Sequence, residues 1–217
     1  MKNQKNKSIA LNLSYVLHER SNSDTVARYI RARDAELRRC TKAIREFGPL
    51  SDAELRNRLI ILDESARSGA TGGRGVQIVS VDIGAGELFP RLLHVAGIVK
   101  PEIPTFGCLL DGPTSIGDSA QTFFGAPAQL NTQASPAELH ADALFATAVF
   151  RPGFESILLR VTALETDADC GDVNWQSATR LAEAVIREFP SQWWCERPLW
   201  QRPAEETLPE FASTETE

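Results

Sequence analysis

The sequence of 217 residues lacks any apolar run that approaches the roughly 18 residues a membrane-spanning helix needs. It also lacks a Cys-x-x-Cys pair, since Cys40, Cys108, Cys170 and Cys195 are scattered along the chain. None of its three histidines has a second histidine or a cysteine at ligand spacing, so we expect no metal site. These absences argue against a transmembrane protein, a disulfide-rich secreted domain and a zinc enzyme, and they predict buried, reduced thiols in the cytoplasm.

The chain carries no strong excess of one charge. Its formal net charge is −6, with 24% charged and 42% hydrophobic residues, as in an ordinary soluble globular domain. This balance argues against a nucleic-acid-binding protein. The length fits one domain. We expect a polar N-terminal arm over 1–21, an α/β domain over 22–203 and a disordered acidic tail over 204–217.

Two helices are predicted near the N-terminus and form an expected helical pair. The first covers 24–47, with Asp24 as its cap and Gly48-Pro49 at its end. The second begins at Ser51, where Glu54 completes a capping box, and is expected to run to about residue 68.

Further along, short apolar runs alternate with one helical pattern before a closing helix. We predict strands over 76–81, 104–110, 121–124, 143–151 and 156–163, and helices over 87–96 and 174–188, with a last short helix from Pro190. This order predicts an α/β fold with a mixed central sheet flanked by helices.

The first predicted helix has a basic face. Residues 28–45 contain seven basic and two acidic residues. Arg33 breaks the pattern because it lies near the apolar side. A basic amphipathic helix suits anionic lipid headgroups or an acidic carrier protein, although a solvated face is the alternative. The candidate contact residues are Arg28, Arg31, Arg38, Lys42 and Arg45.

The candidate chemistry lies in the segment 75–88, which is typical of a buried strand, a tight glycine turn and a helix start. Asp82 follows the strand and Glu87 stands five positions later. The alternative for Asp82 is an N-cap of the next helix, and for Glu87 an acid of the first helical turn. Asp111 follows another apolar strand, ahead of a Gly-Pro turn, and could equally be an ordinary turn residue.

Three segments in order resemble the bacterial late lipid A (lauroyl/myristoyl) acyltransferase family, within the lysophospholipid acyltransferase-like superfamily. Asp82 to Glu87 resembles its His-x-x-x-x-Glu motif, with aspartate in place of the histidine. Residues 123–128 read Phe-Phe-Gly-Ala-Pro-Ala, and residues 184–194 end in Pro-Ser-Gln-Trp-Trp. The resemblance covers roughly residues 60–203 and implies a shortened glycerolipid-acyltransferase-like fold.

The same resemblance implies a reaction and shows where this chain departs from it. In that family the histidine is a general base toward an acceptor hydroxyl that attacks an acyl thioester, and the acidic residue orients it. Asp82, Glu87 and Asp111 are therefore the candidate catalytic residues. An aspartate, with a reference pKa of about 3.9 against about 6.5 for histidine, is ordinarily a weaker base. Only 35 residues separate Glu87 from Phe123, so the family's second, arginine-containing substrate motif is missing.

The functional expectation is an acyltransferase-family protein that handles acyl thioesters of acyl carrier protein or CoA. Its acceptor would be a lipid or small-molecule hydroxyl or amine, and its motif would be weakened or inactive. It would need no cofactor, and would lie in the bacterial cytoplasm or peripherally on the inner membrane. A partner subunit supplying the missing motif is left open.

Two other readings remain open. One is a non-catalytic binding or scaffold protein of the same fold, a pseudoenzyme. The other is an S-adenosylmethionine methyltransferase, because 81–86 also resembles its glycine loop. There the third glycine is replaced by Leu88, and the ribose ligand would have to be Glu102.

Overall fold

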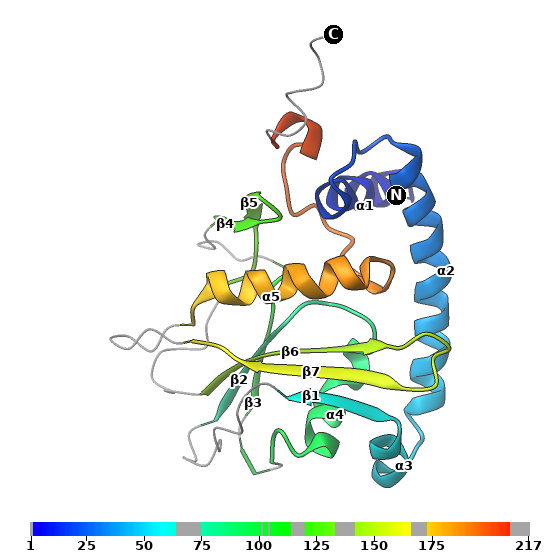
Figure 1. Cartoon of the computed structure of the whole chain (residues 1–217), viewed down its shortest axis with the longest axis vertical. Coiled ribbons are helices and arrows are strands. Elements are labelled where there is room, and N and C mark those ends of the chain that lie inside the picture. The colour runs from blue at the N-terminus through cyan, green and yellow to red at the C-terminus, as the bar shows by residue number, and fades with distance from the viewer. Residues whose placement is uncertain are drawn as a thin grey trace.

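The computed structural model is a mixed α/β protein with a mainly parallel central sheet flanked by helices (Figure 1). It describes residues 2–63, 75–100, 102–103, 105–113, 120–132, 142–165 and 173–208. The helices are α1 (Lys2–Leu17), α2 (Asp24–Phe47), α3 (Asp52–Asn57), α4 (Phe89–Ala96) and α5 (Trp175–Glu188), with 3-10 turns η1 (Gly86–Leu88), η3 (Pro190–Gln192) and η4 (Ala204–Glu206). The strands are β1 (Leu59–Asp63), β2 (Val76–Ser80), β3 (Thr105–Leu109), β4 (Ala120–Phe123), β5 (Ala126–Gln129), β6 (Asp142–Phe150) and β7 (Ile157–Ala163).

The main sheet has five strands in the order β1-β7-β6-β2-β3. The β6–β7 pair is antiparallel, as expected for the late hairpin, and the other pairs are parallel. The carboxyl ends of β2, β3 and β6 therefore meet at one edge. In open α/β sheets, ligands bind in the crevice outside such strand ends, so this edge is the first place to look for a site.

Each face of the sheet has its own hydrophobic core. Figure 1 shows α5 crossing above the sheet and α3 below it, while α2 runs alongside. Because strand side chains alternate between faces, Phe145 and Val149 of β6 join the α1 and α5 core, whereas Leu144 and Phe150 join the α2 and α4 core. The central strands are buried on both faces, as parallel strands usually are.

The bounds of α2 confirm the prediction, but its cap differs. Ser23, not Asp24, caps the helix, because the Ser23 side chain accepts a hydrogen bond from the Val26 backbone N–H. The capping box of Ser51 and Glu54 is present at α3. The helix expected over 51–68 is wrong beyond Asn57, because residues 59–63 form β1 beside β7. In β1 the side chains of Leu59, Ile60 and Ile61 are partly buried, and residues 64–68 lie outside the described part.

The segment expected to be a polar arm forms a helix instead. Ile9, Leu13 and Tyr15 of α1 are at most 2% exposed, so this helix belongs to the folded body. Its lysines all lie in the first half of the helix, and its apolar residues form a nearly continuous run over 9–17 that is interrupted only by Asn12 and Ser14, so the sequence shows no clear helical period there. At the other end, Ala204 and Leu208 are also buried, so the first residues of the expected tail are packed. Residues 209–217 lie outside the described range.

The Phe-Phe-Gly segment is the turn of a small antiparallel hairpin, β4–β5, of which only the first strand was predicted. Phe124 and Gly125 have φ values of 49° and 80°, as a type I′ hairpin turn requires at both central positions. Both phenylalanines are fully buried, and the Phe123 ring stacks against Trp200 at 5.7 Å between centroids. No described helix is long and apolar enough to span a bilayer.

Candidate functional site

Asp82 lies in the loop that follows β2, at the carboxyl edge of the sheet. Its side chain is exposed and lines a cavity of about 260 Å³. Glu87, on the η1 turn just before α4, lines the same cavity. Both carboxylates of the candidate motif therefore border one space. The N-cap alternative for Asp82 is wrong, because Ala85 occupies the cap of η1 and makes no side-chain cap bond.

Asp111 supports Asp82 from behind. It is 5% exposed, and its two carboxylate oxygens have different donors. Oδ1 accepts a hydrogen bond from the Asp82 backbone N–H at 2.9 Å, and Oδ2 accepts one from Trp193 Nε1 at 2.7 Å. The Arg197 Nε donates to the Asp111 backbone carbonyl at 3.0 Å. Asp111 is thus joined to the candidate site as a support for the Asp82 backbone.

The Pro-Ser-Gln-Trp-Trp segment clamps the loop that carries Asp82. The Trp194 backbone N–H donates to the Asp82 carbonyl at 2.8 Å, and the Gly84 N–H donates to the Gln192 carbonyl at 3.0 Å. The Gln192 side-chain amide in turn bonds the backbone N–H and carbonyl of Phe150 at 2.9 and 2.7 Å. Two of the three segments singled out in the sequence therefore meet in space at one loop.

Gly84 is required by this packing. Its φ is +59°, and a Cβ there would lie 2.5 Å from the Ala148 carbonyl oxygen and 2.7 Å from the Val149 Cα. Both contacts are to backbone, so no side-chain rotation relieves them. The glycine lets the loop approach β6 closely enough for the Ala85 N–H to donate to the Ala148 carbonyl at 2.8 Å.

The Asp82 carboxylate has an altered acidity. Its pKa is raised to about 6, chiefly by burial and also by the charges of Asp111 and Glu87, while the charge of Arg33 opposes the shift. The side chain keeps contact with solvent although it lines the cavity. Burial also raises the pKa of Asp111, against the hydrogen bonds from Asp82 and Trp193.

Ser80 is the other polar residue of the cavity lining, and the rest of the wall is largely apolar. Ile83, Phe89 and Ala148 contribute to it, together with Leu109, which is 43% exposed. No basic side chain is found among the described residues that line it. Such a space can accept an apolar group next to two carboxylates. The described residues contain no cluster of three or more histidine, cysteine or acidic side chains suited to a metal ion.

Arg33 is a residue of this region that sequence reasoning left without a role. It is 2% exposed, and its Nε donates to the Trp193 carbonyl at 2.8 Å. Burial lowers its pKa, while Glu196 and Asp34 oppose that shift. The available signal was an arginine near the apolar face of an otherwise regular amphipathic helix.

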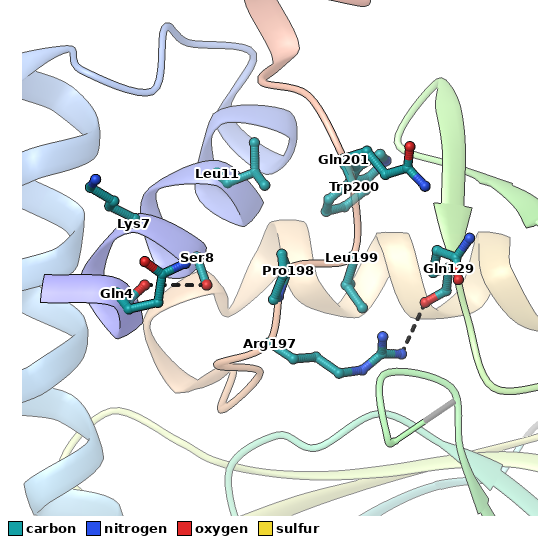
Figure 2. A pocket seen from close by; sticks show the side chains of 10 residues that line it. All are labelled: Gln4, Lys7, Ser8, Leu11, Gln129, Arg197, Pro198, Leu199, Trp200 and Gln201. Atoms are coloured by element: carbon teal, nitrogen blue, oxygen red, sulfur yellow. Dashed lines mark hydrogen bonds between the residues drawn. The ribbon is translucent and has the colours of Figure 1, made fainter. Parts of the chain in front are cut away.

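A second, more open cleft of about 550 Å³ lies between α1, the chain at 197–201 and the end of β5 (Figure 2). Its lining in the described chain has two basic residues, Lys7 and Arg197, and no acid. Arg197 is partly committed, since its Nη2 donates to the Gln129 carbonyl at 2.9 Å, and the Ser8 hydroxyl donates to the Gln4 carbonyl at 3.3 Å. The cleft suits a small polar or anionic group, and it was missed because α1 was not expected.

The other candidate residues lie on the surface of α2 or in the core. Every member of the proposed basic face of α2 is exposed. Trp193 and Trp200 are core residues, 2% and 3% exposed. The side chains of Cys40, Cys108 and Cys195 are buried, as predicted, and Cys170 lies outside the described residues.

No protein-family model matches this chain, and no curated protein matches its sequence.

Proposed function

We propose that this protein handles acyl thioesters of acyl carrier protein or CoA and transfers the acyl group slowly to a lipid or small-molecule hydroxyl or amine. The observation that carries the proposal is the placement of Asp82, which lies on an apolar-walled cavity at the end of a central strand, with Glu87 on the same wall. Two of the three ordered sequence segments support it, since those around Asp82 and Gln192 meet at one loop.

Proton transfer in this proposal falls to Asp82. The acceptor X–H attacks the thioester carbonyl carbon, its proton passes to the carboxylate, and the tetrahedral intermediate expels the thiolate, which takes a proton back. With a pKa of about 6, Asp82 is much closer to the about 6.5 of histidine than an ordinary aspartate is. It is mostly ionised at neutral pH and basic enough to act, and general-base assistance is worth about 10²–10⁴-fold.

The same cavity explains why the transfer should be slow. A tetrahedral intermediate carries a negative oxygen, which needs hydrogen-bond donors or positive charge. The described lining offers two carboxylates and no basic side chain, and its one hydroxyl, that of Ser80, donates to the Val81 carbonyl. Glu87 therefore opposes the developing charge. The short segment between Glu87 and Phe123 also leaves no room for the family's second substrate motif.

The test is thioester consumption measured side by side for the natural protein, Asp82→Asn, Asp82→His and Glu87→Gln. We expect slow turnover by the natural protein that rises with pH around 6 and falls about 10²-fold in Asp82→Asn. Asp82→His alone should restore little. If turnover is the same in Asp82→Asn and Glu87→Gln as in the natural protein, the chemistry lies elsewhere and the proposal fails.

The absence of a basic side chain from the described cavity lining favours one alternative, a binding or scaffold protein of the same fold. Such a protein would bind the thioester without consuming it and would tolerate loss of both carboxylates. The methyltransferase reading is tested by titration with S-adenosylmethionine. Mass spectrometry of co-purifying small molecules would identify the ligand in each case.

We further propose that the basic face of α2 meets the acidic surface of a carrier protein, with an anionic membrane surface as the alternative. The protein would then work in the bacterial cytoplasm or on the inner membrane, in a lipid A-like pathway. A partner subunit could supply the missing substrate motif.

A further inference from the structure

Arg33 is the inward-facing base of an otherwise outward-facing basic helix. The neighbouring bases of α2, such as Arg31 and Arg38, are exposed, whereas Arg33 is 2% exposed. Its Nη1 and Nη2 are buried and have no hydrogen-bond partner among the described residues, although the Asp34 carboxylate lies 3.9 Å from Nη1. An unsatisfied buried cation is unfavourable, so this residue calls for a reason beyond packing.

The contacts of Arg33 lead directly to the candidate site. Its Nε holds the Trp193 carbonyl. The indole of the same tryptophan donates to Asp111, which receives the Asp82 backbone N–H on its other oxygen. The next residue, Trp194, donates its backbone N–H to the Asp82 carbonyl. Both the N–H and the carbonyl of Asp82 are therefore hydrogen-bonded. The N–H binds Asp111, which also binds Trp193, and the carbonyl binds Trp194, so both bonds depend on the segment that Arg33 contacts.

We propose that Arg33 is a positioning residue of the Asp82 site, which holds the Trp193–Trp194 segment against the Asp82 loop and faces the acidic groups there with a buried positive charge. It touches neither the cavity nor a substrate, so it acts through Asp82. The consequence for turnover rests on the proposed function, whereas the effect on the Asp82 carboxylate does not.

Electrostatics supports this role, because Asp82 stands among several negative groups. Arg33 is the cation that lowers its pKa against burial and the neighbouring acids. Without that charge, Asp82 would hold its proton nearer to neutral pH and fewer molecules would have a free base. The titratable and charged groups around the pair are Asp34, Asp111, Glu87, Glu196, Cys195 and Arg197.

The experiment follows the Asp82 carboxyl carbon by NMR through a pH titration of the full chain, with the signal assigned by its loss in Asp82→Asn. Arg33→Gln keeps a hydrogen-bond donor for the Trp193 carbonyl but removes the positive charge. Arg33→Lys keeps the positive charge but removes the planar guanidinium group. We expect the titration midpoint of Asp82 to rise by about one pH unit in Arg33→Gln. It should stay within a few tenths of a unit in Arg33→Lys.

The matched control is Arg31→Gln, which removes an exposed arginine from the same helix and should leave the midpoint unchanged. Near-ultraviolet circular dichroism establishes that each variant keeps its buried tryptophans packed. An unchanged midpoint in folded Arg33→Gln, or an equal shift in Arg31→Gln, would overturn the proposal. If Arg33→Gln fails to fold, a midpoint in Arg33→Lys that departs by as much as one unit would overturn it, and a preserved midpoint supports it.

A second readout links the residue to the reaction. If the protein consumes thioesters, the pH dependence of turnover in Arg33→Gln should shift upward together with the Asp82 midpoint. If no variant consumes thioesters, the proposed function fails, yet the NMR titration still decides whether Arg33 acts on Asp82.

Discussion

The pKa of the Asp82 carboxylate depends more on the surroundings of the side chain than on the residue type. Histidine and aspartate differ by more than two pKa units in water. Burial and neighbouring acids remove most of that difference here, because they raise the Asp82 pKa to about 6. The substitution visible in the sequence is therefore chemically milder than the residue names suggest.

This shift has a consequence for stability that can be measured. The folded-state pKa of about 6 lies above the unfolded value of about 3.9, so the folded protein binds the proton more tightly. The contribution of Asp82 to the free energy of unfolding therefore falls as pH rises from about 4 to about 6, and is flat above. Urea unfolding of the natural protein and Asp82→Asn should show the variant gaining relative stability from pH 4.5 to pH 7. A constant difference would mean that the pKa is not raised.

Gly84 offers a sharper test of the loop geometry. Gly84→Ala places a methyl group 2.5 Å from the Ala148 carbonyl oxygen at a φ of +59°, so overpacking adds to backbone strain, about 2–4 kcal/mol together. Gly97 has a φ of +75° but nothing within 4 Å of its Cβ position, so Gly97→Ala should cost only about 1 kcal/mol. Urea denaturation measures both. Equal losses would mean that the loop does not approach β6 as closely as described.

At the level of elements, α2 has an apolar inner face and a basic outer face. Its apolar face packs below the sheet through Cys40, Ile44 and Phe47, and Arg33 on the inner side reaches the candidate site. The outer face carries exposed bases in a chain whose formal net charge is −6. Such local concentration is what an acidic partner would recognise.

The basic face is tested by replacing Arg31, Arg38, Lys42 and Arg45 with glutamine. Binding to acyl carrier protein or to anionic vesicles should weaken about 100-fold or more at low salt, because each charge contributes on the order of 1 kcal/mol near an anionic surface. Binding by the natural protein should also weaken with added salt.

The control for this prediction removes the same charge from other elements. Four exposed bases elsewhere serve this purpose, and their replacement by glutamine should change binding little; they are Lys100, Arg151, Arg180 and Arg202. Equal weakening in both sets would indicate an effect of net charge alone, and unchanged binding in the first set would remove α2 as the contact surface.

The elements that could be predicted share a property. Where periodicity and caps agreed, as in α2, α5 and the β6–β7 hairpin, the sequence placed the element within a residue or two. The strand β1 was mistaken for helix because its partner β7 lies about a hundred residues away, and no local pattern reports that pairing. The helix α1 was missed because its polar first half hides its apolar second half, and its contacts with α2 and with the C-terminal segment make it a core element.

Across the whole molecule, the sequence named Asp82, Glu87 and Asp111 as site candidates, but it gave no role to Arg33 and did not predict how Trp193 and Asp111 bond. Asp82 and Glu87 share a strand–turn motif, so sequence places them together. Arg33, Trp193 and Asp111 come from three distant segments, and their bonds depend on how the C-terminal segment crosses both α2 and the sheet edge. A local sequence motif can indicate which residues lie at a site, whereas the pKa values of these residues depend on packing between segments that are distant in the sequence.

The same C-terminal segment depends on α1, which gives the last prediction. The α1 residue Asn12 donates to the Arg197 carbonyl at 2.7 Å and accepts from the Leu199 N–H at 3.1 Å, and the Tyr15 ring stacks on Trp200 at 4.2 Å. Leu13 of α1 is 2% exposed. Together with Ile9 it packs against Val26 of α2.

Leu13→Ala should therefore lower the free energy of unfolding by about 2–5 kcal/mol, whereas Lys7→Ala, at an exposed position of the same helix, should stay within about 0.5 kcal/mol. Urea unfolding followed by tryptophan fluorescence measures both, because the α1 contacts keep Trp200 buried. Removing residues 2–17 altogether should abolish cooperative unfolding, since the lost burial, about 1.5–3 kcal/mol for each large buried side chain, approaches the total stability of a typical domain, about 5–15 kcal/mol. An unchanged urea unfolding midpoint in the shortened chain would mean that this segment does not stabilise the fold and is the polar arm that its composition first indicated.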